Sequence, residues 1–128
     1  MSFLVLPTND IFDQVIGAAI KVHRHFGPGL LESAYRHSLQ WELESRGVPV
    51  RTEVPVNVEY KGKVIEAAYR LDLLVDDRLI VELKSVERLN PVHQAQMITY
   101  LKVTGLRTGL LINFNVELLR QGLRRVLL

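Results

Sequence analysis

Three charged side chains interrupt apolar stretches in the middle of the chain, and their spacing could support metal-dependent chemistry. Asp72 stands among the apolar residues of the segment 71–75, where a carboxylate is costly unless it is paired or binds a metal. The sequence Glu82-Leu83-Lys84 follows, and strand alternation would send Glu82 and Lys84 to one face. Together these residues could form a site of two carboxylates and one ammonium group.

The turn between the two segments decides whether Asp72 meets Glu82. A two-residue turn at residues 76–77 would place Asp72 opposite Val81, and Glu82 would then lie on the other face. A three-residue turn at residues 76–78 would place Asp72 directly across from Glu82, with Cβ atoms roughly 4.5–5.5 Å apart. We predict the three-residue turn, or a bulge with the same effect.

This pair of carboxylates indicates a metal site. Two carboxylates so close repel each other unless a cation lies between them. An all-oxygen site without histidine favours Mg²⁺, or Mn²⁺ in its place, over zinc. A neighbouring lysine can hold or help deprotonate a water and stabilise charge on a phosphoryl oxygen, which suits phosphodiester hydrolysis. The alternative is structural: Glu82 and Lys84 would be surface residues of a strand, and Asp72 would form a salt bridge with Arg70.

A fourth carboxylate, Glu32, lies in a predicted helix. On a helical wheel it falls between Leu39 and Leu43, on the apolar side, so its side chain is expected to face the protein. The alternative is a first-turn glutamate that the helix dipole favours and that needs no function.

Gln96 and Tyr100 could contact a substrate. They are four residues apart in a predicted helix, so they share a face, and both can donate hydrogen bonds to phosphate or sugar oxygens. Alternatively, the tyrosine packs against the core and the glutamine faces solvent. Of the four histidines, only His93, one turn before Gln96, is expected near the site.

The elements that would hold these residues follow from hydrophobic periodicity and turn signals. Gly27-Pro28-Gly29 separates the first two helices, and Asn90-Pro91 begins the third, which Gly105 ends. The order ααβββαβ, with a helical crossover before the fourth strand, predicts an α/β domain with a mixed sheet. The predicted helices cover residues 10–26, 30–46 and 91–104, and the strands cover 50–60, 64–75, 79–84 and 107–113, with an edge strand at 124–128.

Length and composition narrow the class of protein. The 128 residues suit one domain, 1–128, and 48% hydrophobic content suffices for a core. The absence of cysteine excludes disulfide scaffolds and thiolate zinc sites, and it fits a cytoplasmic location. No signal peptide or membrane span is expected. The net charge of +2 says little, but the segment 101–128 has five basic residues and one acidic residue, which could meet phosphates or simply face solvent.

A longer pattern of residues resembles a known family. The segment Gly27-Pro28-Gly29-Leu30-Leu31-Glu32-Ser33-Ala34-Tyr35 resembles the signature of the GxxExxY family, with Gly29, Glu32 and Tyr35 at its named positions. The resemblance covers nearly the whole chain, and it continues through residues 60–62, 70–75, 81–84, 96–101 and 111–114. That family is similar to a branch of the PD-(D/E)XK nuclease superfamily, which has a restriction-endonuclease-like core.

The resemblance implies roles for individual residues. Asp72, Glu82 and Lys84 would be the superfamily's catalytic residues, and Glu32 would lie near the metal as a fourth member. The backbone carbonyl of Leu83 would be a further metal ligand. Gln96 and Tyr100 would match a Gln-x-x-x-Tyr motif of recombination-type exonucleases.

These observations predict a Mg²⁺-dependent nuclease, with DNA favoured over RNA as substrate. Two alternatives stay open, because one fold hosts many functions. The chain could be a catalytically inactive module that binds nucleic acid or a partner protein, or an assembly protein whose acidic cluster is only structural. A domain this short has little surface for grasping a duplex. A homodimer or a partner protein could supply the rest of that surface.

Overall fold

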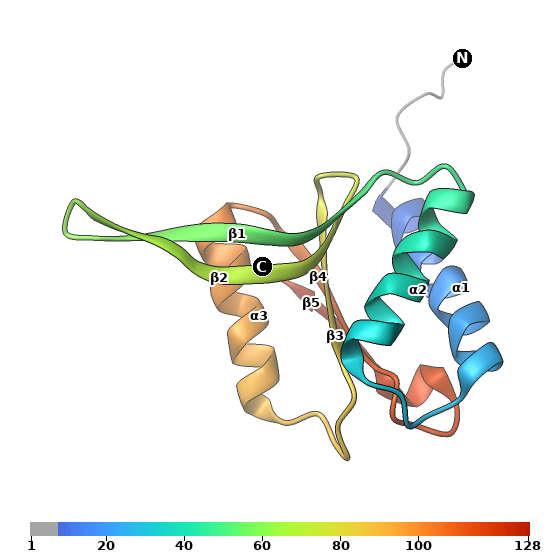
Figure 1. Ribbon diagram of the computed structural model, residues 1–128. Coiled ribbons are helices and arrows are strands. Elements are labelled where there is room, and N and C mark those ends of the chain that lie inside the picture. Colours follow the sequence, from blue (N-terminus) through green and yellow to red (C-terminus); the bar gives the residue numbers. More distant parts are fainter. Residues whose placement is uncertain (1–7) are drawn as a thin grey trace.

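Two helices begin the described part of the protein. The computed structural model describes residues 8–128 (Figure 1). Helix α1 spans Thr8–Phe26 and α2 spans Glu32–Ser45, close to the predicted bounds. Gly27 and Gly29 both have positive φ values, 68° and 105°, which glycine adopts without strain. This loop turns the chain so that α2 packs beside α1.

A five-stranded sheet forms the centre of the protein. Its order is β1-β2-β3-β4-β5, and within residues 8–128 β3–β4 is the one parallel pair. The predicted α/β class with a mixed sheet and the order ααβββαβ are therefore confirmed, including the edge strand at the C-terminus. The strands are β1 (Val50–Tyr60), β2 (Lys63–Val75), β3 (Leu79–Lys84), β4 (Thr108–Asn113) and β5 (Leu123–Leu127), with a 3₁₀ turn at Leu119–Gly122.

Helix α3 (Pro91–Thr104) is the crossover between the two parallel strands. The side chain of Asn90 accepts hydrogen bonds from the backbone N–H groups of Val92 and His93, which caps the helix. Gly105, in the left-handed conformation with φ 76°, ends it. The sequence signals for both ends are thus confirmed.

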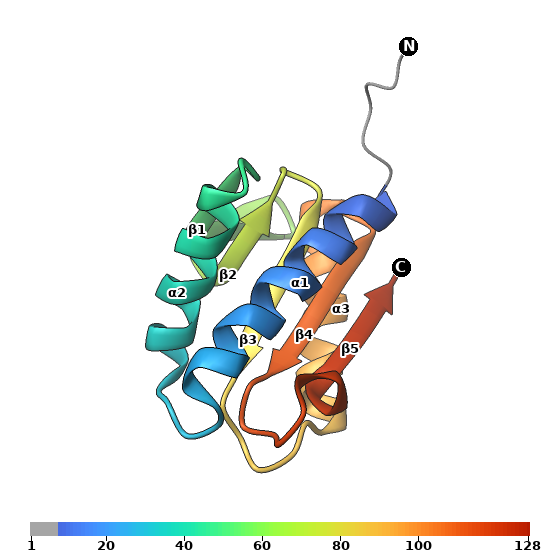
Figure 2. The same ribbon diagram turned by 90° about the vertical axis from the view of Figure 1, so that its right-hand side faces the viewer.

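Helices cover both faces of the sheet (Figures 1 and 2). Helices α1 and α2 pack on one face and α3 packs on the other. We call the apolar layer under the helix pair the helix-pair core, and its members from the sheet include Leu73, Val75, Val81, Leu83, Leu110 and Ile112. We call the other layer the α3 core, which contains Leu71, Leu74, Ile80, Met97, Tyr100, Leu101, Leu111 and Val126.

The basic C-terminal segment does not form one continuous surface. Arg125 on β5 lies over the ring of Phe12 in α1, 4.0 Å from its centroid. Arg124 lines a pocket with the first turn of α3, which is on the opposite face of the sheet. Strand alternation therefore separates two neighbouring arginines that the sequence places side by side.

None of the helices within residues 8–128 is long and apolar enough to cross a membrane.

Candidate active site

The turn between β2 and β3 has three residues, as predicted. Val75 pairs with Leu79 and Leu73 pairs with Val81, so the turn is formed by residues 76–78. One position further along the same register, Asp72 lies opposite Glu82. The parity argument from the sequence is confirmed, and the two carboxylates come from neighbouring strands.

The β2–β3 ladder opens where these carboxylates meet. The backbone N–H of Asp72 donates to Oε1 of Glu82 over 2.9 Å, and the N–H of Leu83 donates to Oδ2 of Asp72 over 2.9 Å. Side-chain oxygens therefore replace backbone carbonyls as acceptors. Each carboxylate is anchored by the strand that carries the other, so the pair cannot separate without breaking both hydrogen bonds.

The strand pleat changes at Asp72. Leu74 and Leu71 both belong to the α3 core, whereas Leu73 belongs to the helix-pair core, so simple alternation fails between positions 71 and 73. On the other side of β2, the register would pair Asp72 with Glu53, but Glu53 has a left-handed backbone with φ 50° and is skipped in the ladder. This local irregularity is what frees Asp72 to turn its carboxylate toward Glu82.

Burial makes the carboxylate pair electrostatically costly. It raises the pKa of Glu82 to about 8, and the nearby charge of Asp72 adds to the effect. Burial also raises the pKa of Asp72, although the N–H of Leu83 and the charges of Lys84 and Arg36 act in the opposite direction. A proton shared between the two groups, or a cation, would relieve their repulsion.

The structural alternative for Asp72 is not observed. Within residues 8–128, no ion pair involves Asp72, Glu82 or Lys84, so the salt bridge to Arg70 is absent. Arg36, whose charge acts on Asp72, forms an ion pair of 3.3 Å with Glu53 instead. Lys84 follows Glu82 by two residues at the end of β3 and is half-buried.

The Leu83 carbonyl points toward the same opening. The carbonyl of Lys84 accepts from the N–H of Phe114, on the β4 side of β3. Because successive carbonyls alternate between the two sides of a strand, the Leu83 carbonyl points toward β2. The opening between β2 and β3 therefore has two carboxylates and one backbone oxygen around it.

Glu32 reaches the end of β3 but has a partner there. It is the first residue of α2, and its Oε2 accepts from the backbone N–H of Ser85 over 3.2 Å. The prediction that its side chain faces the protein holds for the carboxylate, although the residue as a whole is exposed. Across residues 8–128, no group of three or more Asp, Glu, His or Cys side chains gathers as a metal site, so Glu32 stands apart from the acidic pair.

The loop before α2 is fastened to the same place. The hydroxyl of Tyr35 donates to the carbonyl of Gly27 and accepts from the N–H of Leu30. The hydroxyl of Ser85 donates to the Leu30 carbonyl over 2.8 Å. Tyr35 itself is buried and stacks on Phe114, with ring centroids 4.3 Å apart. Tyr35 thus holds the α1–α2 loop together, and Leu30 and Glu32 join this loop to Ser85, the residue after Lys84.

Tyr100 lies near the acidic pair, on the α3 side. Burial raises its pKa, and the negative charges of Glu82, Asp72 and Tyr69 raise it further. Its ring meets that of Tyr69 edge to face, with centroids 5.2 Å apart. Gln96, one turn earlier, is half-buried. His93 has another role, because its Nδ1 accepts from the N–H of Asn90 and completes the helix cap.

The sequence does not indicate the role of one important polar residue, Asn113. It is 2% exposed and pairs with Lys84 across the β3–β4 ladder. Its Oδ1 accepts from the N–H groups of Val86 and Asn115, and its Nδ2 donates to the Val86 carbonyl. Asn113 therefore holds the loop that leaves β3 just after Lys84. A polar residue at the end of an apolar strand is the only sequence signal for this role.

We predict that Asn113→Ala lowers the free energy of unfolding by about 1–3 kcal/mol, because it leaves buried backbone groups without partners. Urea unfolding followed by circular dichroism measures the change. Asn115→Ala is the control, since the Asn115 side chain donates to the same Val86 carbonyl over a long 3.4 Å. Equal losses in the two variants would contradict a special role for Asn113.

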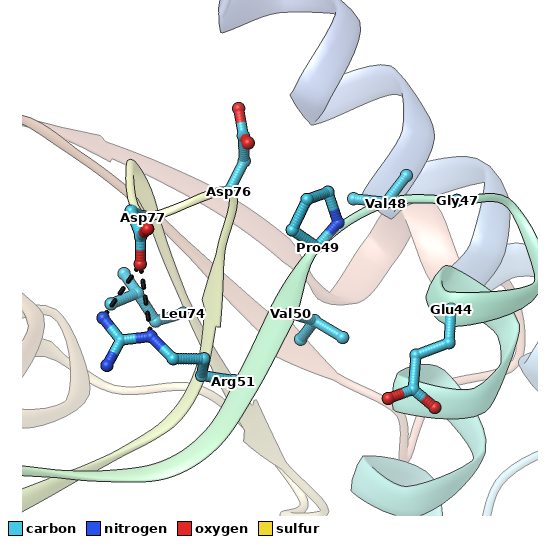
Figure 3. Close-up of a pocket in the computed structure, with 9 residues that line it drawn as sticks. All are labelled: Glu44, Gly47, Val48, Pro49, Val50, Arg51, Leu74, Asp76 and Asp77. Atoms are coloured by element: carbon cyan, nitrogen blue, oxygen red, sulfur yellow. Dashed lines mark hydrogen bonds and ion pairs between the residues drawn. The ribbon is translucent and has the colours of Figure 1, made fainter.

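The pocket in Figure 3 lies away from the acidic pair. It is lined by the end of α2, the start of β1 and the β2–β3 turn, with Asp77 bonded to Arg51. The turn is at the opposite end of β3 from Glu82 and Lys84. The candidate catalytic residues Asp72, Glu82 and Lys84 therefore lie at the opening of the β2–β3 ladder and not in this pocket.

Comparison with known proteins identifies the family. A family model described as the PD-(D/E)XK nuclease superfamily matches residues 9–126, which is nearly the whole chain. Searches among curated proteins and among solved structures found no match. The match does not distinguish a branch, so membership of the GxxExxY family stays a prediction. The matched range includes both carboxylate strands, and the chain belongs to the PD-(D/E)XK nuclease superfamily.

Proposed function

We propose that the protein is a metal-dependent nuclease that hydrolyses phosphodiester bonds at the opening between β2 and β3. The observation that carries this proposal is the pair Asp72 and Glu82, held in contact by each other's strands beside Lys84. Superfamily members are generally nucleases, which supports the same activity.

The donor set fits a hard divalent cation. Asp72, Glu82 and the Leu83 carbonyl supply oxygens only, and Mg²⁺ commonly binds through one or two carboxylates and keeps several waters. The raised pKa of Glu82 is a further argument, because a cation would offset the repulsion that burial imposes. When bound, Mg²⁺ or Mn²⁺ would lower the pKa of a water and neutralise charge on the phosphoryl group. Glu32 stands apart from the acidic pair and would support the site through its hydrogen bond with the N–H of Ser85.

The remaining residues would bind and orient the substrate. The ammonium group of Lys84 would donate a hydrogen bond to the attacking water and stabilise charge that develops on a phosphoryl oxygen. Gln96 and Tyr100 would orient the strand from α3 through hydrogen bonds to phosphate or sugar oxygens. Of the C-terminal arginines, Arg124, which lies on the α3 face beside Gln94, would add sequence-independent attraction for the backbone.

DNA is favoured over RNA as the substrate. The GxxExxY family is the favoured branch, because the ordered resemblance covers nearly the whole chain. A homodimer or a partner protein would add surface for gripping a duplex. A cytoplasmic location fits the absence of cysteine. The alternative is an inactive module on the same fold that binds nucleic acid or protein without cutting.

The test is cleavage of labelled single- and double-stranded DNA and RNA in Mg²⁺, Mn²⁺ or EDTA, with wild type compared to Asp72→Ala. We expect metal-dependent products from wild type and their loss in the variant. Asp77→Ala is the matched control, because it removes an exposed aspartate at the far end of the same hairpin. Binding without cleavage of any substrate would instead favour the inactive module.

A further inference from the structure

The β1–β2 hairpin extends beyond the body of the protein. In Figure 1 the two strands project past α3, and their turn at Lys61 and Gly62 is far from the other elements. We call residues 57–66 the hairpin arm. At its base the register between β1 and β2 shifts, and Ala67 has a left-handed backbone with φ 49° whose N–H donates to the Asn57 side chain. The arm is thus set off from the sheet by a bulge.

An apolar stripe runs along the arm without a cover. On β1, Val54 and Val56 pack against the α3 core, and strand alternation puts Val58 and Tyr60 on the same face. Ile65 lies across from Val58 on that face. Beyond α3 the stripe is open to solvent, because Tyr60 is 65% exposed and Ile65 is 54% exposed. The same face of the hairpin is therefore packed in the α3 core at its base and exposed to solvent at its tip.

The arm also has an open edge. β1 is the outermost strand of the sheet, so one row of its backbone groups has no neighbouring strand within the described residues. An isolated two-stranded hairpin is marginally stable in water, and a third strand or a packed layer is usually needed. Exposed edges with apolar side chains are also the edges on which other chains pair.

The charges of the arm favour a protein partner over nucleic acid. The arm contains two lysines, Lys61 and Lys63, and two glutamates, Glu59 and Glu66, so its net charge is zero. Phosphate-binding surfaces need an excess of positive charge. Two copies of a neutral arm approach without net repulsion, and an apolar stripe can pack on the same stripe of a second copy about a two-fold axis.

From these observations we propose that the hairpin arm is a homodimer interface, in which the stripe of Val58, Tyr60 and Ile65 packs on the same stripe of a second copy. The contact is isologous: each arm covers its partner's stripe and is covered in return. The arm has ten residues, fewer than the roughly 20–30 residues a side of a standard interface, so we expect a weak dimer that dissociates on dilution.

Sedimentation equilibrium over a range of concentrations tests the interface. We expect wild type to pass from monomer to dimer, and Ile65→Lys or Tyr60→Thr to raise the dissociation constant at least tenfold, or about 1.4 kcal/mol. Val92→Lys is the matched control, since Val92 is 72% exposed on α3, away from the arm, and should leave the constant unchanged. Wild type that stays monomeric throughout the range would overturn the proposal.

The cysteine-free sequence allows a second, direct test. With Ile65→Cys, a short bis-maleimide should link two chains across the two-fold axis. Val92→Cys should dimerise as wild type does but should not be cross-linked. Equal cross-linking of both variants would overturn the proposal. The proposal would also be overturned if the arm variants associate to the same mass in solution as wild type but lose affinity for labelled DNA or RNA. The arm would then be a nucleic-acid contact. Neither measurement depends on cleavage, so the interface is tested independently of the proposed nuclease activity.

Discussion

Lys84→Ala is expected to lower the rate of metal-dependent phosphodiester cleavage by at least about 10²-fold, the effect typical of losing one preorganised donor to a transition state. Lys84 follows Glu82 by two residues on β3, and its ammonium group forms no ion pair within residues 8–128. The variant should remain folded, since the side chain is half-buried and the β3 hydrogen bonds are made by the backbone.

The control for this variant is Lys102→Ala, which removes an exposed lysine from the last turn of α3. Single-turnover cleavage and urea unfolding should be measured on both proteins. We expect Lys102→Ala to cleave at nearly the wild-type rate, and both variants to unfold within about 1 kcal/mol of wild type. Full activity in Lys84→Ala would remove this residue from the proposed mechanism, and a loss of folding would make the activity measurement uninformative until Lys84→Gln is compared.

The second large effect concerns stability and pH. The pKa of Glu82 is raised from 4.5 to about 8 in the folded protein, so between these values the folded state binds more protons than the unfolded state. The free energy of unfolding of the metal-free protein should therefore fall as pH rises through this window. The change should be on the order of a few kcal/mol, because one pKa unit corresponds to about 1.4 kcal/mol.

Glu82→Gln tests the origin of this pH dependence. The amide keeps an oxygen for the Asp72 N–H but cannot ionise, so its unfolding free energy should vary little across the window. Mg²⁺ should stabilise wild type at pH 8 by about 2.7 kcal/mol at one hundred times its dissociation constant, and stabilise the variant far less. Glu87→Gln, at an exposed loop position, is the control. A wild-type stability that rises with pH in EDTA would contradict the buried pair as its cause.

The elements and the pairing of the two carboxylates were predictable because they depend on local signals. Helix α3 begins at Asn90-Pro91 and ends at Gly105, as capping chemistry requires. The three-residue turn at residues 76–78 then decides by parity alone which side chains face each other. Short-range rules of this kind act within a few residues, so the sequence is sufficient to apply them.

Contacts between distant segments were decided only by the tertiary structure. Helical periodicity turns Glu32 toward the protein, but its acceptance of the Ser85 N–H depends on where the α1–α2 loop meets the end of β3. Asn113 is a buried polar residue whose partners in the loop after Lys84 become known only when the strands are paired. The open ladder at Asp72 likewise arises from a left-handed residue on a third strand, Glu53, which periodicity does not reveal.

The same division explains the two surfaces. The sequence by itself determined that the C-terminal segment is basic and that the β1–β2 hairpin alternates apolar and polar residues. Only the tertiary structure decided that Arg124 and Arg125 lie on opposite faces of β5 and that the apolar stripe of the arm runs past the end of α3. Charge and periodicity are properties of the chain, whereas cover and exposure depend on which other segment packs there, and that is a long-range outcome of folding.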